Sequence, residues 1–170
     1  QPQGPVYIVL DVGMQEAKLD PVPIIPDVSR FNVEADPAPT AESVQAAVRM
    51  LKTSKFPLIM AGRVSRGQED WDRRVAFVEA LGANVITNQR TAAAFPTHHP
   101  LHPNDLNYRT TANDNNLIQK ADVILNLDWL DFGGTLQAAG GTDAKIISVS
   151  MDDLNSNGWS FDHHVLPAVD

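Results

Sequence analysis

The sequence predicts an α/β protein: a three-layer α/β/α Rossmann-like domain with a parallel sheet of five to six strands, preceded by an extended N-terminal segment. Two observations predict this fold. Short apolar runs alternate with segments of helical periodicity from residue 40 onward, which is the pattern of βαβ units. These runs are apolar throughout rather than at alternate positions, as is typical of strands that helices cover on both faces.

The first 39 residues follow a different pattern. The run Pro5-Val6-Tyr7-Ile8-Val9-Leu10 is rich in β-branched and aromatic residues and predicts a buried strand, which needs a sheet elsewhere to pair with. Five prolines then fall between Pro21 and Pro39 without sustained periodicity. Because proline fixes its own φ and favours extended geometry in the residue before it, residues 14–39 are expected to form a stiff, extended linker.

From residue 40 the elements follow one another regularly, with an additional short extended piece expected near Leu101. Thr40 and Gly82 are the expected caps at the start of the first helix and the end of the second. The spacing of apolar residues predicts helices over residues 44–51, 68–81, 111–120 and 135–139. Apolar runs predict strands at residues 56–61, 85–87, 123–127, 146–149 and 165–166.

Composition narrows the function. The chain has 170 residues, of which 43% are hydrophobic, and a net charge of −8, so it is typical of a globular protein. An acidic chain lacks the clustered cations that bind phosphates, which argues against nucleic-acid and anionic-membrane partners. No apolar run approaches the roughly 20 residues of a membrane helix, and no signal peptide is visible. Zero cysteines exclude disulfides and thiolate sites, so we expect a cytoplasmic protein.

The candidate binding residues follow the predicted strands. Gly62 permits a sharp turn after the first strand of the domain, and Arg63 and Arg66 beside it suit an anionic ligand. The complete dinucleotide fingerprint is absent, so a glycine needed for strand-to-helix packing is the stronger interpretation. Three acids, each able to bind a ligand or to cap the next helix, stand just beyond other strand ends: Asp128, Asp131 and Asp152.

Two further patterns resemble metal sites. His98, His99 and His102 are close in sequence, but the prolines around them favour an exposed loop over converging ligands. Residues 153–158 match the first half of a calcium loop, although the expected glutamate at its twelfth position is His164. A turn rich in Asp and Asn is the stronger interpretation, and a calcium-responsive adaptor is a weak alternative. No catalytic set of residues and no metal site are predicted.

Several stretches together resemble the thiamine-diphosphate-dependent enzymes of the acetolactate synthase, benzoylformate decarboxylase and pyruvate oxidase type. The most specific is Phe95-Pro96-Thr97-His98-His99-Pro100-Leu101, which is similar to a family loop written F-P-x-x-H-P-L. The others occur in the family's order and span nearly the whole chain: residues 4–12, 56–62, 80–85, 121–128 and 145–152.

The resemblance implies a domain organisation. Residues 1–13 would be the end of a pyrimidine-binding domain, residues 14–39 a linker, and residues 40–170 the central Rossmann-like domain. Thiamine diphosphate and Mg²⁺ would be held by flanking domains outside this chain, in a homo-oligomeric parent enzyme. The parent would be a 2-keto-acid lyase, decarboxylase or synthase, and this chain alone would be structural and not catalytic.

Some members of that family bind FAD or ADP on the central domain. The residues that would hold such a nucleotide here are Gly62, Arg63, Asp128 and Asp152. Ser150 replaces the first acid of the family's I-D-I-D stretch, which Asp152 completes. The alternative to the structural domain is therefore a stand-alone nucleotide-binding or regulatory Rossmann-like module.

Overall fold

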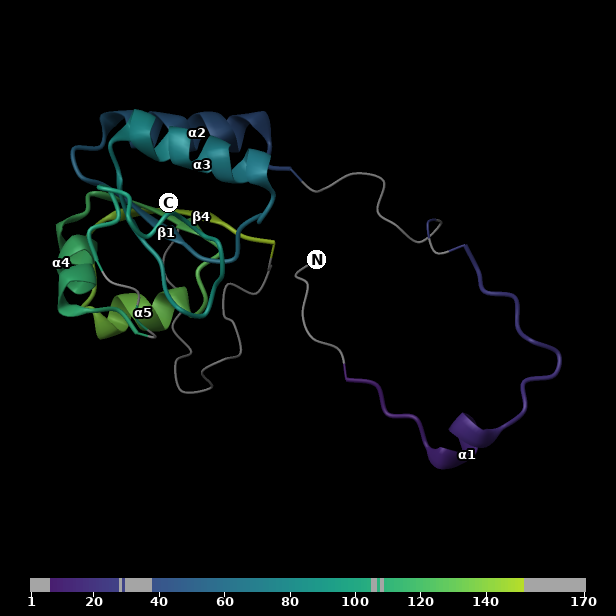
Figure 1. Cartoon of the computed structure of the whole chain (residues 1–170). Coiled ribbons are helices and arrows are strands. Elements are labelled where there is room, and N and C mark those ends of the chain that lie inside the picture. The colour runs from purple at the N-terminus through teal and green to yellow at the C-terminus, as the bar shows by residue number, and fades with distance from the viewer. Residues whose placement is uncertain (1–6, 28, 30–37, 105–106, 108, 152–170) are drawn as a thin grey trace. The chain divides into compact units, whose positions relative to one another are not determined.

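The computed structural model describes residues 7–27, 29, 38–104, 107 and 109–151 (Figure 1). The chain forms two units, Pro2–Thr40 and a unit that begins at Ala41. The predicted strand at residues 165–166 and the calcium-type turn at residues 153–158 lie outside the described residues. None of the helices in the described part combines the length and apolar character that crossing a lipid bilayer requires.

The N-terminal unit has one short helix, α1 (Val12–Glu16), which the sequence reasoning did not predict. The carboxylate of Asp11 caps it by accepting a 3.0 Å hydrogen bond from the backbone N–H of Met14. Residues 7–10 form no strand, contrary to the prediction from their β-branched composition. Strand propensity alone does not make a strand, because a strand forms only when it pairs with another, and Tyr7 is 91% exposed.

The described part of the second unit contains α2 (Ala41–Thr53), β1 (Pro57–Ala61), α3 (Gln68–Leu81), β2 (Asn84–Ile86), α4 (Ala112–Lys120), β3 (Val123–Leu127), α5 (Phe132–Ala138) and β4 (Lys145–Val149). These four strands form a parallel sheet in the order β2-β1-β3-β4. A helix precedes each strand along the chain. The α/β class and the parallel sheet are confirmed, but the predicted five to six strands are too many for the described residues. Leu101, expected in a short extended piece, lies in a turn instead. Its carbonyl accepts a 2.7 Å hydrogen bond from the N–H of Val85 in β2.

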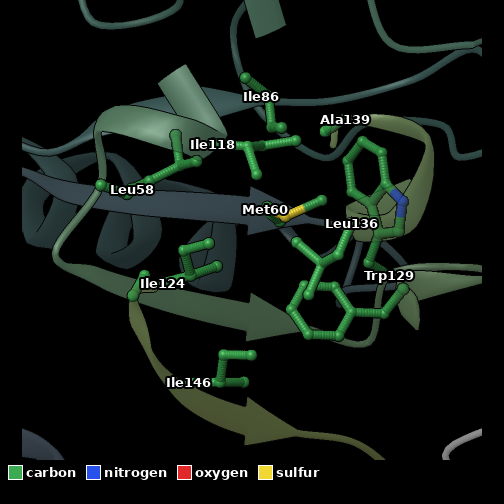
Figure 2. Packing of buried hydrophobic residues seen from close by; sticks show 12 residues of the cluster. Leu58, Met60, Ile86, Ile118, Ile124, Trp129, Leu136, Ala139 and Ile146 are labelled. Atoms are coloured by element: carbon green, nitrogen blue, oxygen red, sulfur yellow. The ribbon is translucent and has the colours of Figure 1, made fainter. Parts of the chain in front are cut away.

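Helices cover both faces of the sheet. In Figure 1, α2 and α3 lie on one face and α4 and α5 on the other. Alternate residues of β1 enter opposite cores, as a strand requires: Leu58 and Met60 pack toward α4 and α5, whereas Ile59 packs with residues of α2 and α3. Figure 2 shows the first core, in which Trp129 and Leu136 lie beside the strand residues. This double cover explains why β1, the strand whose residues are all buried, is apolar throughout.

Local signals set most helix ends. Gly82 ends α3 with φ of 64°, a left-handed conformation that glycine adopts without strain. Thr111 begins α4 through a capping box, in which Thr111 and Asp114 satisfy each other's backbone N–H groups. Helix α5 starts three residues before the predicted range because the carboxylate of Asp131 caps it at the N–H of Gly134.

Candidate functional site

The chain order places a topological switch point between β1 and β3. After β1 the chain crosses to β2 on one side, and after β2 it returns to the other side of β1 to form β3. Open parallel sheets bind ligands at the carboxyl ends of the strands on either side of such a point. Gly62 and Arg63 follow β1 and Asp128 follows β3, so three of the four predicted site residues meet here. The fourth, Asp152, lies outside the described residues.

The two strand ends are closed against each other by backbone contacts. The N–H of Gly62 donates a 2.9 Å hydrogen bond to the carbonyl of Leu127, and the N–H of Arg63 donates one of 3.0 Å to the carbonyl of Asp128. A Cβ on Gly62 would overlap the Asp128 carbonyl and the Cα of Trp129. Glycine is therefore required because the turn after β3 passes directly over the end of β1.

An ion pair lies across this closed junction. The Nε of Arg63 is 2.7 Å from Oδ2 of Asp128, and its Nη2 donates a 3.1 Å hydrogen bond to Oδ1. The hydroxyl of Ser150, just beyond β4, donates a 2.5 Å hydrogen bond to the same Oδ1. The side chains of Arg63 and Asp128 are 32% and 14% exposed, so solvent screens the pair only in part. The residues that follow β1, β3 and β4 are thereby tied together.

These residues fit a nucleotide diphosphate poorly. Phosphates bind to free backbone N–H groups and unpaired cations near a helix N-terminus. Here the N–H groups of Gly62 and Arg63 are bonded to the carbonyls of Leu127 at the end of β3 and of Asp128 just after it, and a carboxylate accompanies the guanidinium. The first turn of α3 carries Glu69 and Asp70, which would repel a phosphate at that helix end.

An arginine that the sequence reasoning did not single out organises the neighbouring loops. The Nε of Arg74 on α3 donates a 2.7 Å hydrogen bond to the carbonyl of Ala94, and its Nη2 donates to the carbonyls of Ala93 and Ser65 at 3.2 Å. Burial lowers the pKa of Arg74, an effect that Asp70 partly offsets. Ala93 has φ of 53°, and the Arg74 contacts hold this left-handed residue in place.

The histidine loop is a packing element. The ring of Phe95 lies edge-on to the ring of His99 at 5.1 Å and stacks with that of His102 at 6.4 Å. His99 accepts a 3.1 Å hydrogen bond at Nδ1 from the Leu101 N–H, and its Nε2 is 3.2 Å from a carboxylate oxygen of Glu79. Among the described residues, no three His, Asp or Glu side chains gather closely enough to hold a metal.

The expectation of an exposed loop is wrong for His102, which is 5% exposed. Its Nε2 lies 2.8 Å from the hydroxyl of Thr87 at the end of β2. Burial lowers the pKa of His102, and the nearby carboxylate of Asp114 offsets this only in part. His102 is buried because the apolar side chain of Phe95 packs in the core and holds this part of the loop there, whereas His98 stays exposed.

A second polar junction lies at the opposite, amino edge of the sheet. The carboxylate of Asp122, just before β3, accepts hydrogen bonds from the Ser54 hydroxyl and from the backbone N–H groups of Lys55 (2.7 Å) and Phe56 (3.0 Å). It joins the loop after α2 to the loop after α4. An open hollow of about 440 Å³ lies beside it, lined by residues that include Arg49 and Lys145.

The family model described as "Thiamine pyrophosphate enzyme, central domain" matches residues 44–159, more than half of the chain. The chain belongs to this family. The resemblance inferred from the sequence is therefore confirmed, as is the expected Rossmann-like central domain. The motif around Phe95 and the Asp122 junction both lie within the matched range, and both serve to pack the domain.

The curated relatives give the family match a more specific context. The chain is 37% identical over 118 residues to a sulfoacetaldehyde acetyltransferase from Alcaligenes xylosoxydans xylosoxydans, which covers 66% of this chain and 20% of the relative. It is 35% identical over 122 residues to another from Roseovarius nubinhibens, covering 68% of this chain and 20% of the relative. A 3D-(3,5/4)-trihydroxycyclohexane-1,2-dione hydrolase from Geobacillus thermodenitrificans is 24% identical over 70% of the chain and 19% of the relative. The chain spans about one fifth of the length of these relatives.

Proposed function

We propose that this chain works as the architectural central domain of a larger thiamine-diphosphate enzyme and supplies none of its catalytic groups. The observation that carries the proposal is the exposed apolar surface of the N-terminal unit. Among the residues of this unit that the structure describes, ten large apolar side chains are more than half exposed, far beyond the scattered apolar residues of an ordinary surface. They are Tyr7, Ile8, Val9, Leu10, Val12, Met14, Leu19, Val22, Ile24 and Ile25.

Residues 7–10 fit an edge strand of a neighbouring sheet. A strand of this composition gains its backbone hydrogen bonds only by adding to a sheet, and the preceding domain of the parent is the proposed acceptor. The residues up to 13 would then belong to that domain, and residues 14–39 would link it to the central domain. Tyr7 is 91% exposed and Ile8 is 74% exposed, so burying both would favour this addition.

The parent activity we propose is that of a sulfoacetaldehyde acetyltransferase. Two relatives with this name are 35–37% identical to the chain across about two thirds of its length. Thiamine diphosphate with Mg²⁺ would be bound by the flanking domains and would serve as the electron sink of the reaction. Action on a 2-keto acid, which the sequence predicts, is the alternative activity. A homo-oligomeric parent and a cytoplasmic location also remain predictions.

The test compares the parent protein with this chain. Loaded with thiamine diphosphate and Mg²⁺, the parent should consume sulfoacetaldehyde faster than pyruvate, a 2-keto acid. A loaded, folded parent that consumes only pyruvate would refute the proposed substrate. In hydrogen exchange, the backbone N–H groups of residues 7–10 should exchange slowly in the parent and rapidly in the chain alone. Equally rapid exchange in both would refute the strand addition.

A further inference from the structure

We propose that the β1–β3 switch point of this chain is a structural clasp that excludes nucleotide diphosphates. We use the name clasp for Gly62, Arg63, Asp128 and Ser150. In an open parallel sheet this is the usual place for a dinucleotide. Here the residues predicted to bind a nucleotide would instead keep one out. This role is independent of the activity proposed for the parent.

The backbone donors at this switch point already have acceptors within the chain. A bound diphosphate needs N–H groups at the end of the first strand and at the start of the following helix. Gly62 and Arg63 donate theirs to carbonyls of β3 and the turn after it, at 2.9 and 3.0 Å. The N–H of Gly67, at the start of α3, donates a 3.3 Å hydrogen bond to the Ser65 hydroxyl. A phosphate would have to break these hydrogen bonds before any of these three N–H groups could donate to it.

Backbone atoms also fill the space beside Gly62. The turn after β3 lies so close to Gly62 that a single methyl group at Gly62 would overlap backbone atoms of Asp128 and Trp129. Because both contacts involve backbone, a rotamer change does not open the crevice. Asp128 itself has φ of 52°, a left-handed conformation that a non-glycine residue adopts only where its surroundings hold it.

The charges at the clasp also oppose a phosphate. Arg63 contacts Asp128 through Nε and Nη2, at 2.7 and 3.1 Å, so the cation best placed for a phosphate already has an anion beside it. The Asp128 carboxylate also accepts the Ser150 hydroxyl at 2.5 Å, which fixes its position. A diphosphate in the crevice would face this carboxylate and the acids in the first turn of α3, Glu69 and Asp70.

The experiment combines ligand titration with a double-mutant cycle. ADP and FAD are titrated calorimetrically into the chain, and urea midpoints are measured for Arg63→Met, Asp128→Asn and the double variant. Asparagine tolerates the left-handed conformation and keeps the shape of aspartate, so Asp128→Asn removes the charge with little other change. Ser150→Ala is a milder second variant. Asp143→Asn, at an exposed acid outside the clasp, is the matched control.

The proposal predicts no saturable binding of ADP or FAD to the chain, that is, a dissociation constant above about 1 mM. Each single clasp variant should lower the folded-to-unfolded ratio by roughly fivefold, and the double variant by little more, because both remove the same ion pair. Ser150→Ala should lower the ratio less, and Asp143→Asn should leave it unchanged. Saturable ADP or FAD binding that Arg63→Met weakens would overturn the proposal, and so would fully additive losses in the double variant.

Discussion

Replacing Asp122 with alanine should destabilise the domain by about 2 to 3 kcal/mol at neutral pH. Its carboxylate accepts three hydrogen bonds from the loop that precedes β1. Hydrogen bonds to charged groups contribute about 1.5 to 3 kcal/mol each where water is excluded, but Asp122 is exposed, so water replaces part of the loss. With a urea slope of about 1.5 kcal/mol/M, the midpoint should fall by about 1 to 2 M.

The loss should depend on pH with a defined sign. Partial burial raises the pKa of Asp122, but its hydrogen bonds together outweigh this and hold the pKa below its ordinary value. A depressed carboxyl pKa gives stability that is fully present above about pH 4 and is lost as the pH falls through the folded-state pKa. The difference between wild type and Asp122→Ala should therefore be full at pH 7 and should shrink below pH 4.

Circular dichroism at 222 nm during urea unfolding measures the stability of the wild type and the variants, because the helices of the second unit dominate the signal. Asp122→Asn should be intermediate, since it retains one acceptor oxygen. Asp143→Ala is the control: this acid is exposed, and its removal should change stability by less than about 0.5 kcal/mol. A loss at Asp122→Ala no larger than that of the control, or one that persists unchanged at pH 3, would refute the reasoning.

Three other outcomes follow from the structure. Gly62→Ala should lower the free energy of unfolding by more than about 3 kcal/mol, because the new Cβ would overlap backbone atoms. Gly67→Ala should lower it by less than about 1 kcal/mol, because the nearest atom to its new Cβ is 3.6 Å away. Thermal melting of the two variants compares these losses. Gly82→Ala should cost about 1 kcal/mol in urea unfolding from its φ of 64° alone, since nothing lies within 4 Å of the added atom. Burial lowers the pKa of His102, so the stability of the domain should fall as the pH drops below about 6.5. In urea unfolding, His102→Gln should remove this dependence of the midpoint on pH. His98→Gln, at an exposed histidine, should retain it.

Sequence reasoning located the elements well where local signals dominate. Residues 123–127 were predicted as a strand and form β3 over the same range. Helix α3 ends at Leu81 and is capped by Gly82, as the sequence predicts. Both depend on patterns within a few residues: an apolar run of strand length, and a glycine placed where the helical periodicity stops.

The errors arose where structure depends on distant contacts. Tyr7 and its neighbours have strand composition, but a strand forms only when it pairs with another, and residues 7–10 form none in this chain. The sequence predicts an exposed loop at His102, yet His102 is buried because Phe95 packs in the core and holds that part of the loop there. The ion pair between Arg63 and Asp128 joins residues 65 positions apart. Sequence reasoning placed each of them at a strand end, but only the fold shows that they bind each other.

The central claim is that this chain is a structural domain whose cofactor is bound elsewhere in the parent protein. Calorimetric titration of the chain with thiamine diphosphate in the presence of Mg²⁺ tests it most directly, with the parent as the positive control. The account predicts saturable heat for the parent and none for the chain. Saturable, Mg²⁺-dependent binding of thiamine diphosphate by the chain alone would contradict it.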